Sequence, residues 1–275
     1  MGQAKSIIVS AIDSQSANKF VRRKHYSGKV VSNSQLHFGV FLNDRMHGVM
    51  SYGPSLDKGK MVGLVRGTSW TGFLELNRMA FDEVLPRNSE SRALAISFKL
   101  IRKFAPHIKW IVTFADATQC GDGTIYRAAG FDLIGIKRSK NLARLPSGDV
   151  LHKMTVESSP TRPLALLGGR SYADILQGQN SWKRFCGIIG ANILEGFQLK
   201  YIKFLDPTIR DNLTIPILPF SEIDKCGIGM YKGERKICAL SDTIDTSTDQ
   251  VEEDGAIPIS ALQFSDKPFP LDDGK

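Results

Sequence analysis

The chain has 275 residues, a formal net charge of +8 and a pI of about 9.3. This length allows one domain of ordinary size with an extension, or two small domains, and a hydrophobic fraction of 42% is enough for a packed core. No apolar run reaches the ~18 residues needed to span a bilayer, and the N-terminus lacks the apolar region of a signal peptide. We therefore expect a cytoplasmic protein without a membrane segment.

Positive charge is concentrated in the first 236 residues. Residues 237–275 contain nine acids and two lysines, a net charge of −7, which leaves +15 on the preceding part. A basic body beside an acidic tail favours an anionic partner such as nucleic acid. A soluble protein with a charged surface is the plainer alternative. The four cysteines lack the short spacing of a zinc knuckle and are predicted to be free thiols.

Apolar patterning and turn residues predict the order β-α-β-β-β-α-β-α-β-β. The predicted strands cover residues 6–12, 36–42, 46–52, 73–81, 109–114, 131–136 and 150–156; the predicted helices cover 17–25, 89–104 and 126–129. Ser14 or Ser16 is expected to cap the first helix, and Ser89 or Ser91 to begin the second. Residues 53–72 are predicted to form a long loop.

Two basic segments are candidates for contacts with DNA phosphates. One covers the first helix and the residues after it, and the other follows the strand that ends at 136. Cations in a last helical turn are also favoured by the helix dipole, so the first segment has a structural explanation as well. The expected DNA-binding residues are Lys19, Arg22, Arg23, Lys24, Lys29, Lys137, Arg138, Lys140 and Arg144.

The predicted element order is that of the acetyltransferase-like fold of the GNAT superfamily. The sequence therefore predicts an α/β (α+β) fold with a mixed central sheet flanked by helices and a C-terminal extension. Residues 1–157 would form the core, 158–238 the extension packed on it, and 239–275 an acidic, flexible tail.

In that fold a pyrophosphate lies on the N-terminus of the central helix. Here Glu90 and Arg92 stand where the superfamily loop has glycine or another small residue, which disfavours acetyl-CoA and leaves the group donor unknown. Arg87, Ser89 and Arg92 are the candidate cofactor contacts.

Several long strings of the sequence resemble the phage Mom family. They are KHYSGKVV, SQLHFGVF, GVMSYGPSLDK, LELNRMAF, LPRNSESRA, FADATQCGDGTIYRAAGF and LHKMT, with GFQLKYIKFLDP further on. The resemblance covers about residues 20–236. It implies a DNA-modification enzyme that converts adenine in duplex DNA to N6-carbamoylmethyladenine (N6-acetamidoadenine) and so protects phage DNA from host restriction.

The resemblance also transfers site residues by motif: His25, Tyr26, Arg78, Ser91, Asp116 and Tyr126. The family is associated with iron, for which His25, Tyr26 and Asp116 are the candidate ligands. An enzyme acting on adenine N6 must take the base out of the stack and remove an N6 proton, a role that suits Asp116. Arg78 would hold an anionic group of the donor, and Tyr126 would donate a hydrogen bond or stack on the base.

Each of these assignments has a structural alternative. Arg78 and Asp116 would form an ion pair between adjacent strands, Tyr126 would be a buried helix residue, and Ser91 only a helix cap. Two other functions are also open. One is a CoA-dependent N-acetyltransferase acting on a protein or small molecule, and the other is a non-catalytic anti-restriction protein that coats DNA.

Overall fold

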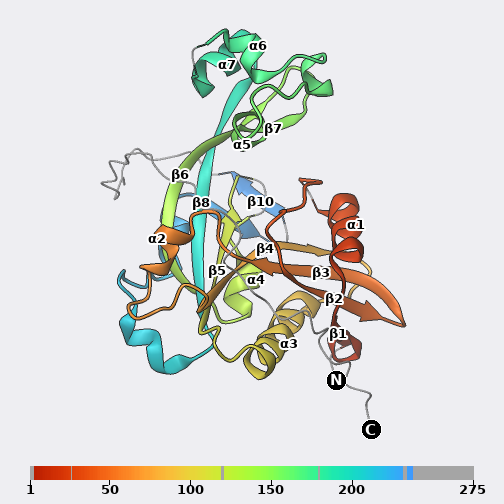
Figure 1. Cartoon of the computed structure of the whole chain (residues 1–275), viewed down its shortest axis with the longest axis vertical. Helices are drawn as coiled ribbons and strands as arrows, with labels where there is room; N and C mark the ends of the chain where they lie inside the picture. Colours follow the sequence, from red (N-terminus) through yellow and green to blue (C-terminus); the bar gives the residue numbers. More distant parts are fainter. Residues whose placement is uncertain (1–2, 26, 119–120, 179, 232–233, 238–275) are drawn as a thin grey trace.

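An eight-stranded mixed sheet forms the framework of the computed structural model, which describes residues 3–25, 27–118, 121–178, 180–231 and 234–237 (Figure 1). The strand order is β1-β2-β3-β4-β5-β8-β6-β7, and β9 and β10 form a separate pair. The strands are β1 (Ile8–Ala11), β2 (Leu36–Leu42), β3 (Arg45–Gly53), β4 (Phe73–Phe81), β5 (Trp110–Asp116), β6 (Asp132–Arg144), β7 (Val150–His152), β8 (Asn192–Phe204), β9 (Ile228–Tyr231) and β10 (Glu234–Ile237).

Helices cover both faces of this sheet. They are α1 (Ser14–Lys24), α2 (Lys58–Val62), α3 (Ser89–Phe104), α4 (Thr124–Ala128), α5 (Lys153–Glu157), α6 (Tyr172–Leu176), α7 (Trp182–Ile188) and α8 (Ser221–Lys225), with 3₁₀ turns η1 (Gln3–Ser6), η2 (Ala165–Leu167) and η3 (Pro207–Asn212). The predicted α/β class, with a mixed sheet flanked by helices, is confirmed. The described residues contain no helix of the length and apolarity that crossing a membrane requires.

Helix α1 begins after Asp13, not after a serine cap as predicted. The Asp13 carboxylate accepts the backbone N–H of Ser16 at 2.8 Å. It thereby satisfies one of the N–H groups that a helix start leaves open. The amphipathic helix buries Ala17, Phe20 and Val21 against β3 and β4, and its basic side chains remain outside.

Strands β4 and β5 form the one parallel pair among the described strands of the large sheet, and they are paired over a short length only. The register joins Phe73, Leu74 and Glu75 to Trp110, Ile111 and Val112. Both strands then continue, β4 to Phe81 and β5 to Asp116, beyond their paired part. We call this opening the β4–β5 wedge. It brings the polar ends of two central strands to one place without a third strand between them.

Strand β8 lies at the centre of the sheet, between β5 and β6. It pairs with β5 along its second half, from Gln198 to Phe204, and with β6 along nearly its whole length. The division of the chain at 157/158 stays a prediction about domains, and the pairing adds that residues beyond 157 supply a central strand. The predicted tail, 239–275, lies outside the described residues.

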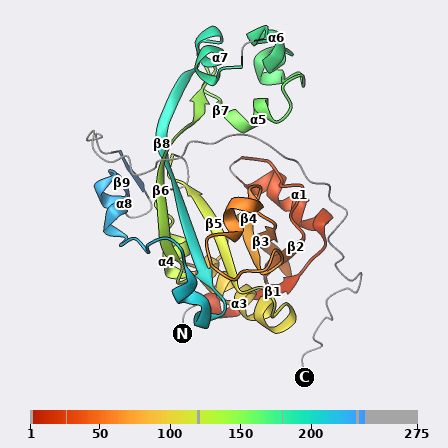
Figure 2. The ribbon, with the colours of Figure 1, turned by 60° about the vertical axis from the view of Figure 1, so that its left-hand side comes forward.

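The second half of β6 and the first half of β8 pair with each other and extend beyond the rest of the sheet. They form a two-stranded ribbon that carries a lobe (Figures 1 and 2). The lobe comprises β7, α5, η2, α6 and α7 and has its own hydrophobic core, which includes Tyr172, Trp182 and Phe185. Two expectations are corrected here. The basic residues at 137–144 lie in β6 and not in a loop, because β8 pairs with them, and the strand predicted over 150–156 ends at His152, where α5 begins.

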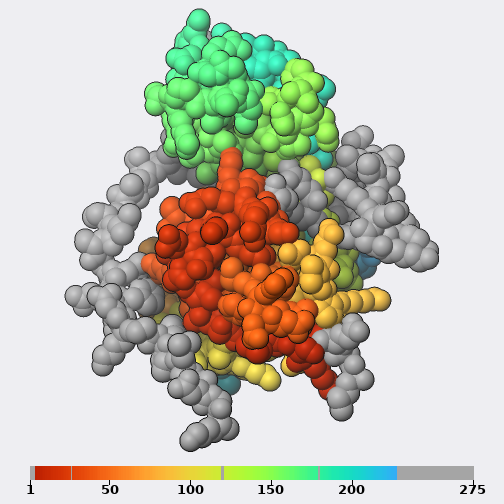
Figure 3. Space-filling model, turned by 90° about the vertical axis from the view of Figure 1, so that its right-hand side faces the viewer, coloured from red at the N-terminus to blue at the C-terminus, as the bar shows by residue number. Residues whose placement is uncertain are grey.

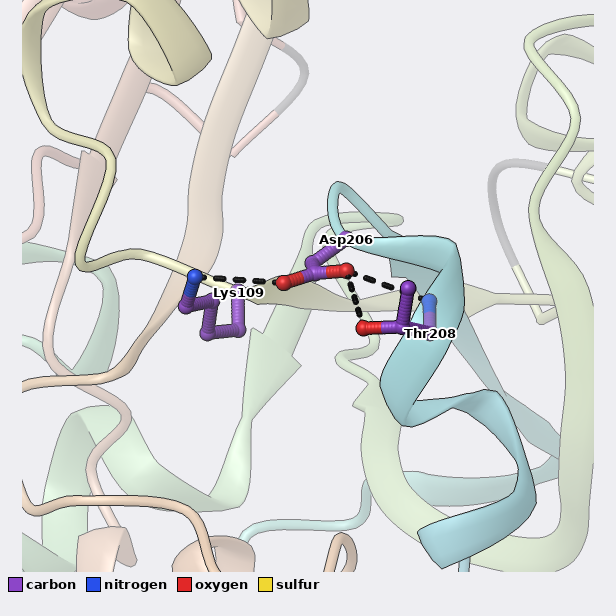
Figure 4. Close-up of polar contacts among 3 residues, drawn as sticks. All are labelled: Lys109, Asp206 and Thr208. Carbon is purple, nitrogen blue, oxygen red and sulfur yellow. Dashed lines mark hydrogen bonds and ion pairs between the residues drawn. The ribbon is translucent and has the colours of Figure 1, made fainter.

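The opposite end of the sheet is closed by polar contacts (Figure 4). Lys109, just before β5, places its Nζ 3.1 Å from the carboxylate of Asp206, just after β8. The same carboxylate accepts the backbone N–H and the hydroxyl of Thr208 at 3.1 and 2.6 Å, which caps η3. These bonds tie β8 to β5 and leave the wedge at the other end of β5 as the open part.

Candidate active site

A β-bulge in β4 determines which face of the sheet Arg78 occupies. Opposite β3, Ser51 pairs with Arg78 and Tyr52 with Leu76, so Asn77 is an extra residue. Leu76 packs into the core beneath α3, whereas Ala80 packs against α1. Because side chains alternate along a strand, Arg78 lies on the α1 face with Ala80. The bulge re-aims the strand here, as bulges beside functional sites often do.

The guanidinium of Arg78 is held by backbone carbonyls. Its Nε donates to the carbonyl of Lys29 at 2.9 Å, and its Nη1 donates to the carbonyl of Asn77 at 2.8 Å. The first bond also fixes the segment that follows α1 over the surface of β4. Arg78 is therefore a positioned positive charge at the wedge, suited to an anionic or carbonyl group of a ligand.

His25 ends α1 at the same place. Its backbone N–H donates to the carbonyl of Val21, and its Nδ1 lies 2.8 Å from the Ser27 hydroxyl and 3.2 Å from the Ser27 N–H. Burial, and next the positive charge of Arg78, lower the pKa of His25 to about 4. The imidazole is therefore neutral at physiological pH and lies close to Arg78.

Asp116 ends β5 on the face that α1 covers. Ala115 packs into the core beneath α3, so the next side chain along the strand lies on the other face. One carboxylate oxygen accepts the backbone N–H of Thr118 at 2.9 Å, which fixes the side chain in a turn. Asp116 is half-buried and meets the requirement for a proton acceptor positioned at a strand end.

Two further ionisable residues border this group and were not predicted from the sequence. His152 is close enough to Asp116, Lys29 and Arg78 for all three charges to act on its pKa, which burial chiefly lowers. Glu75 lies where β4 and β5 cease to pair, and burial is the chief cause that raises the pKa of its carboxyl. Both residues lie inside strings that carry the family resemblance, LHKMT and LELNRMAF, and this is the signal that could have identified them.

Cations outnumber acids at the outer margin of the wedge. Burial, and then the charges of Arg162 and Arg78, lower the pKa of Lys29. The Lys29 ammonium donates to the hydroxyl of Thr155 in α5, and this contact joins the segment after α1 to the lobe. In the space-filling view the lobe lies directly against the N-terminal segment (Figure 3). This margin has the charge that binding a phosphate requires.

Ser91 and Tyr126 belong to the other face of the sheet. The hydroxyl of Ser91 donates to the carbonyl of Asn88 at 3.3 Å, within the first turn of α3. The ring of Tyr126 packs against Phe131 and Tyr201, each 5.5 Å away between ring centroids, in the core beneath α3. The structure thus brings His25, Arg78 and Asp116 to one face, and places these two in local packing on the opposite face.

The loop before α3 is organised by its own backbone and hydroxyl groups. Asn88 adopts a left-handed conformation with φ of 70°, and Ser89 donates both its N–H and its hydroxyl to the carbonyl of Pro86, at 3.1 and 2.6 Å. Arg87 and Arg92 are exposed. The predicted cofactor role of Arg87, Ser89 and Arg92 stays a prediction.

Among the described residues, no group of three or more His, Cys, Asp or Glu side chains is placed to hold a metal ion. Tyr26 lies outside the described residues, and the guanidinium of Arg78 beside His25 disfavours a second cation there. The predicted iron ligands His25, Tyr26 and Asp116 therefore stay a prediction.

All nine residues expected to contact DNA are exposed. Two of them are in ion pairs, Lys24 with Asp82 at 3.3 Å and Lys140 with Glu195 at 2.7 Å. Exposed pairs of this kind contribute little to stability, so phosphates can compete for the cations.

Comparison with known proteins places the chain in a family. The model of the Mom protein family matches residues 6–222, most of the chain. The chain belongs to the Mom protein family. A relative named methylcarbamoylase mom, from Escherichia phage Mu, is 39% identical over 137 residues, which are 50% of this chain and 56% of the relative. The aligned part thus spans about half the length of that Mom protein.

Solved structures resemble this Mom family member more distantly. The ribosomal-protein-S18-alanine N-acetyltransferase from Escherichia coli is 12% identical, with a TM-score of 0.38 over 73% of this chain and 94% of that chain. An N-acyl amino acid synthase from uncultured soil microbes is 14% identical, with a TM-score of 0.40 over 76% of this chain and 95% of that chain.

Proposed function

We propose that this Mom family member is a phage DNA-modifying transferase that adds a carbamoylmethyl group to N6 of adenine in duplex DNA. The product would protect the phage genome from restriction enzymes of the bacterial host, in whose cytoplasm the protein would act. The observation that carries the proposal is the polar group at the wedge of a Mom family fold. Asp116, Arg78 and His25 lie at one sheet face there, and His152 is near enough for the charges of Asp116 and Arg78 to act on it.

The chemistry of the acceptor explains the need for a base. The lone pair of adenine N6 is delocalised into the ring, so N6 becomes an effective nucleophile as its proton leaves. In the proposed step N6 bonds to the methylene carbon of an activated carbamoylmethyl donor, and the bond from that carbon to the leaving group breaks. Asp116 takes the N6 proton, a contribution of about 10²–10⁴-fold for a positioned base.

Positive charge supports the second part of the proposal, the binding of DNA. The target base leaves the helix to be modified, and its flanking phosphates then approach the protein. Lys29, Arg78 and Arg162 lie near one another at the margin of the wedge, and the basic residues of α1 and β6 extend this surface. Phosphate contacts of this kind position DNA without reading its sequence.

The alternative of a CoA-dependent acetyltransferase is less well supported. The Ser89 N–H at the start of α3 is already bonded to Pro86, and Glu90 brings a negative charge to the turn where a pyrophosphate would bind. Iron stays a proposal from the family resemblance, and the donor is an activated two-carbon amide or its precursor.

The decisive experiment expresses the chain in a bacterial host and measures the nucleosides of a resident plasmid by mass spectrometry. We expect a deoxyadenosine that carries one additional carbamoylmethyl group, and resistance of the plasmid to restriction enzymes that cut at adenine-containing sites. Unmodified deoxyadenosine throughout, with the protein folded and abundant, would contradict the proposal. Acetylated small molecules or proteins in the same cells would favour the acetyltransferase.

A further inference from the structure

Polar atoms without partners gather where the segment that follows α1 covers the end of β3. Among the described residues, five buried side-chain polar atoms make no hydrogen bond. Three of them lie here: Asn33 Oδ1 in the segment itself, His37 Nε2 near the start of β2, and Asn77 Nδ2 in the bulge of β4. Buried polar groups are nearly always paired, so unpaired ones in one place indicate a position that a ligand or an ordered water completes.

Hydrogen bonds fix the orientation of the two asparagine amides. Asn33 donates its Nδ2 to the carbonyl of Pro54 at 2.9 Å, so Oδ1 is an acceptor without a donor. Asn77 accepts the hydroxyl of Ser34 on its Oδ1 at 3.1 Å, so Nδ2 is a donor without an acceptor, and only 7% of the Asn77 surface is exposed. Glu75, whose pKa burial raises and Asn77 lowers, is near this amide, yet no hydrogen bond joins it to Nδ2.

Gly53 brings these two residues together at the apex of the wedge. A Cβ on Gly53 would lie 2.3 Å from the backbone carbonyl oxygen of Asn33 and 2.8 Å from Oδ1 of Asn77, so both residues adjoin this one point. Gly53 pairs with Glu75 of β4, and Glu75 forms the last pair of β4 with β5, opposite Val112. The two amides therefore flank the place where β4 and β5 part.

A donor and an acceptor that do not bond to each other complement a primary carboxamide. The carbonyl oxygen of such a group accepts a hydrogen bond and its NH₂ donates one. We propose that Asn77 and Asn33 bind the carboxamide end of the carbamoylmethyl donor. Nδ2 of Asn77 donates to its carbonyl oxygen, and Oδ1 of Asn33 accepts from its NH₂. This assignment rests on the proposed function, which supplies the carbamoylmethyl group.

An anchor at this point directs the reacting carbon towards the proposed base. Arg78 follows Asn77 in β4 and lies on the α1 face, the face on which Asp116 ends β5. A donor held at the apex by its carboxamide extends its methylene carbon into the opening between the two strands. Because both amide atoms are buried, the group enters when the covering segment moves away from β3.

The tight packing at Gly53 favours a small group over the base. Adenine also presents a donor beside an acceptor, and side-chain amides read it by that pattern. Its two fused rings, however, need more room than a position where the backbone of Asn33 already excludes a Cβ. A carboxamide has the same hydrogen-bonding pattern on three heavy atoms.

Near-isosteric substitutions test the donor and the acceptor separately. Asn77→Asp keeps the oxygen that accepts the Ser34 hydroxyl and replaces the unpaired NH₂ by an oxygen. We expect plasmid modification, measured by mass spectrometry, to fall about tenfold or more. Asn33→Asp keeps the acceptor and Asn33→Ala removes it, so the Asp variant should retain more modification than the Ala variant. Asn43→Asp, the same change in the exposed β2–β3 turn, should modify the plasmid as the wild type does. Melting temperatures establish that each variant is folded.

Small amides test the contact without DNA. In the ¹⁵N-labelled full chain, the side-chain NH₂ resonance of Asn77 is identified by its absence from Asn77→Asp and from Asn77→Ser. Acetamide should shift this resonance saturably. N,N-dimethylacetamide, which keeps the carbonyl and lacks the NH₂, should bind about tenfold more weakly. In Asn33→Ala the two amides should bind alike, because the acceptor for the NH₂ is gone.

Several results would overturn the assignment. They are an Asn77 resonance that a large excess of acetamide leaves unchanged, equal binding of the two amides by the wild type, or wild-type modification by folded Asn77→Asp. A bound water at Asn77 that acetamide does not displace, or a shift caused by 9-methyladenine instead of acetamide, would overturn it as well. The proposed function survives each of these as long as the wild type modifies adenine. Unmodified adenine together with acetamide binding at Asn77 would instead reject the proposed function and leave a carboxamide site for another reaction.

Discussion

The two faces of the sheet at the β4–β5 wedge are built from different chemistry. On the α1 face, Arg78 and Asp116 are charged and His25 is ionisable, with His152 nearby. Burial, and after it the charge of Arg78 among others, lowers the pKa of both histidines. On the α3 face, Tyr126 packs into an aromatic cluster. Perturbed ionisable groups gathered in one place are typical of active sites, whereas ring packing is typical of a core. The comparison indicates that proton transfer belongs to the α1 face.

Replacing Asp116 should have the largest effect on the reaction. Asp116→Asn preserves the oxygen that accepts the Thr118 N–H at 2.9 Å, so the turn after β5 should persist. It removes the proton acceptor, and we expect plasmid modification to fall by about 10²-fold or more. Mass spectrometry of plasmid nucleosides and circular dichroism of the purified variant would measure the two effects. A folded variant with full modification would show that Asp116 is not the base.

Removal of the Arg78 guanidinium should cause the next largest loss of plasmid modification. Arg78→Ala breaks the bonds to the carbonyls of Lys29 and Asn77, and Arg78→Lys keeps the charge without the planar fork. We expect modification to fall about 10–100-fold in both, since a hydrogen bond from a charged group contributes ~1.5–3 kcal/mol. The variants should differ in the pKa of His25, which NMR titration of the ring protons reports.

In Arg78→Ala that pKa should rise above about 4, but remain below the ordinary 6.5, because burial is the larger cause of the depression. In Arg78→Lys it should change less. An unchanged pKa in the alanine variant would mean that Arg78 and His25 do not interact, and the two residues would then not form one site.

Acid conditions should lower the free energy of unfolding, because His25 titrates at a lower pH in the folded protein than in the unfolded chain. The neutral ring has a pKa of about 4 in the folded protein and 6.5 in the unfolded chain, so the unfolded chain binds more protons between these values. The free energy of unfolding should therefore decrease as pH falls from about 6.5 to 4 and level off below, by at most ~3 kcal/mol. Urea titrations at several pH values would measure this for the wild type and for His25→Gln.

The wild type and His25→Gln should differ in how their free energy of unfolding depends on pH, and this difference isolates His25. The lowered pKa values of His37 and His152 contribute equally to both proteins. Equal pH dependence in the two proteins would mean that His25 titrates normally in the folded state. The α1 face would then lack a histidine whose pKa is lowered by its surroundings.

Much of this architecture could be predicted from the sequence because strong apolar runs specify it. The strands β2, β3 and β4 and helix α3 lie within a few residues of the predicted ranges. The ribbon could not be predicted, because residues 137–144 are basic and resemble a loop until β8, which begins at Asn192, pairs with them. Non-local pairing of this kind leaves no periodic signal in a single strand.

The candidate site shows the same limit. Arg78 and Asp116 could be found from the strings LELNRMAF and FADATQ that carry the family resemblance, but the bulge at Asn77 that sets the face of Arg78 depends on the register with β3. His152 could not be placed at all, because its neighbours come from β4, β5 and the segment after α1. Tyr26 and the tail 239–275 lie outside the described residues.

The smallest effect should come from the α3 face, where Tyr126→Phe tests the comparison most directly. The substitution preserves the ring that packs against Phe131 and Tyr201 and removes only the hydroxyl. If Tyr126 serves the core, modification should change less than about threefold, and the free energy of unfolding by about 0.5–1.5 kcal/mol, the range for one hydrogen bond. Tyr126→Leu, which removes the ring, should cost more stability than Tyr126→Phe and serves as the packing control. A Phe variant that is as stable as the wild type but has lost modification by about 10²-fold would show that the hydroxyl takes part in the reaction. Residues on both faces of the sheet would then take part in the reaction, and the α3 face would share the chemistry that we assign to the α1 face.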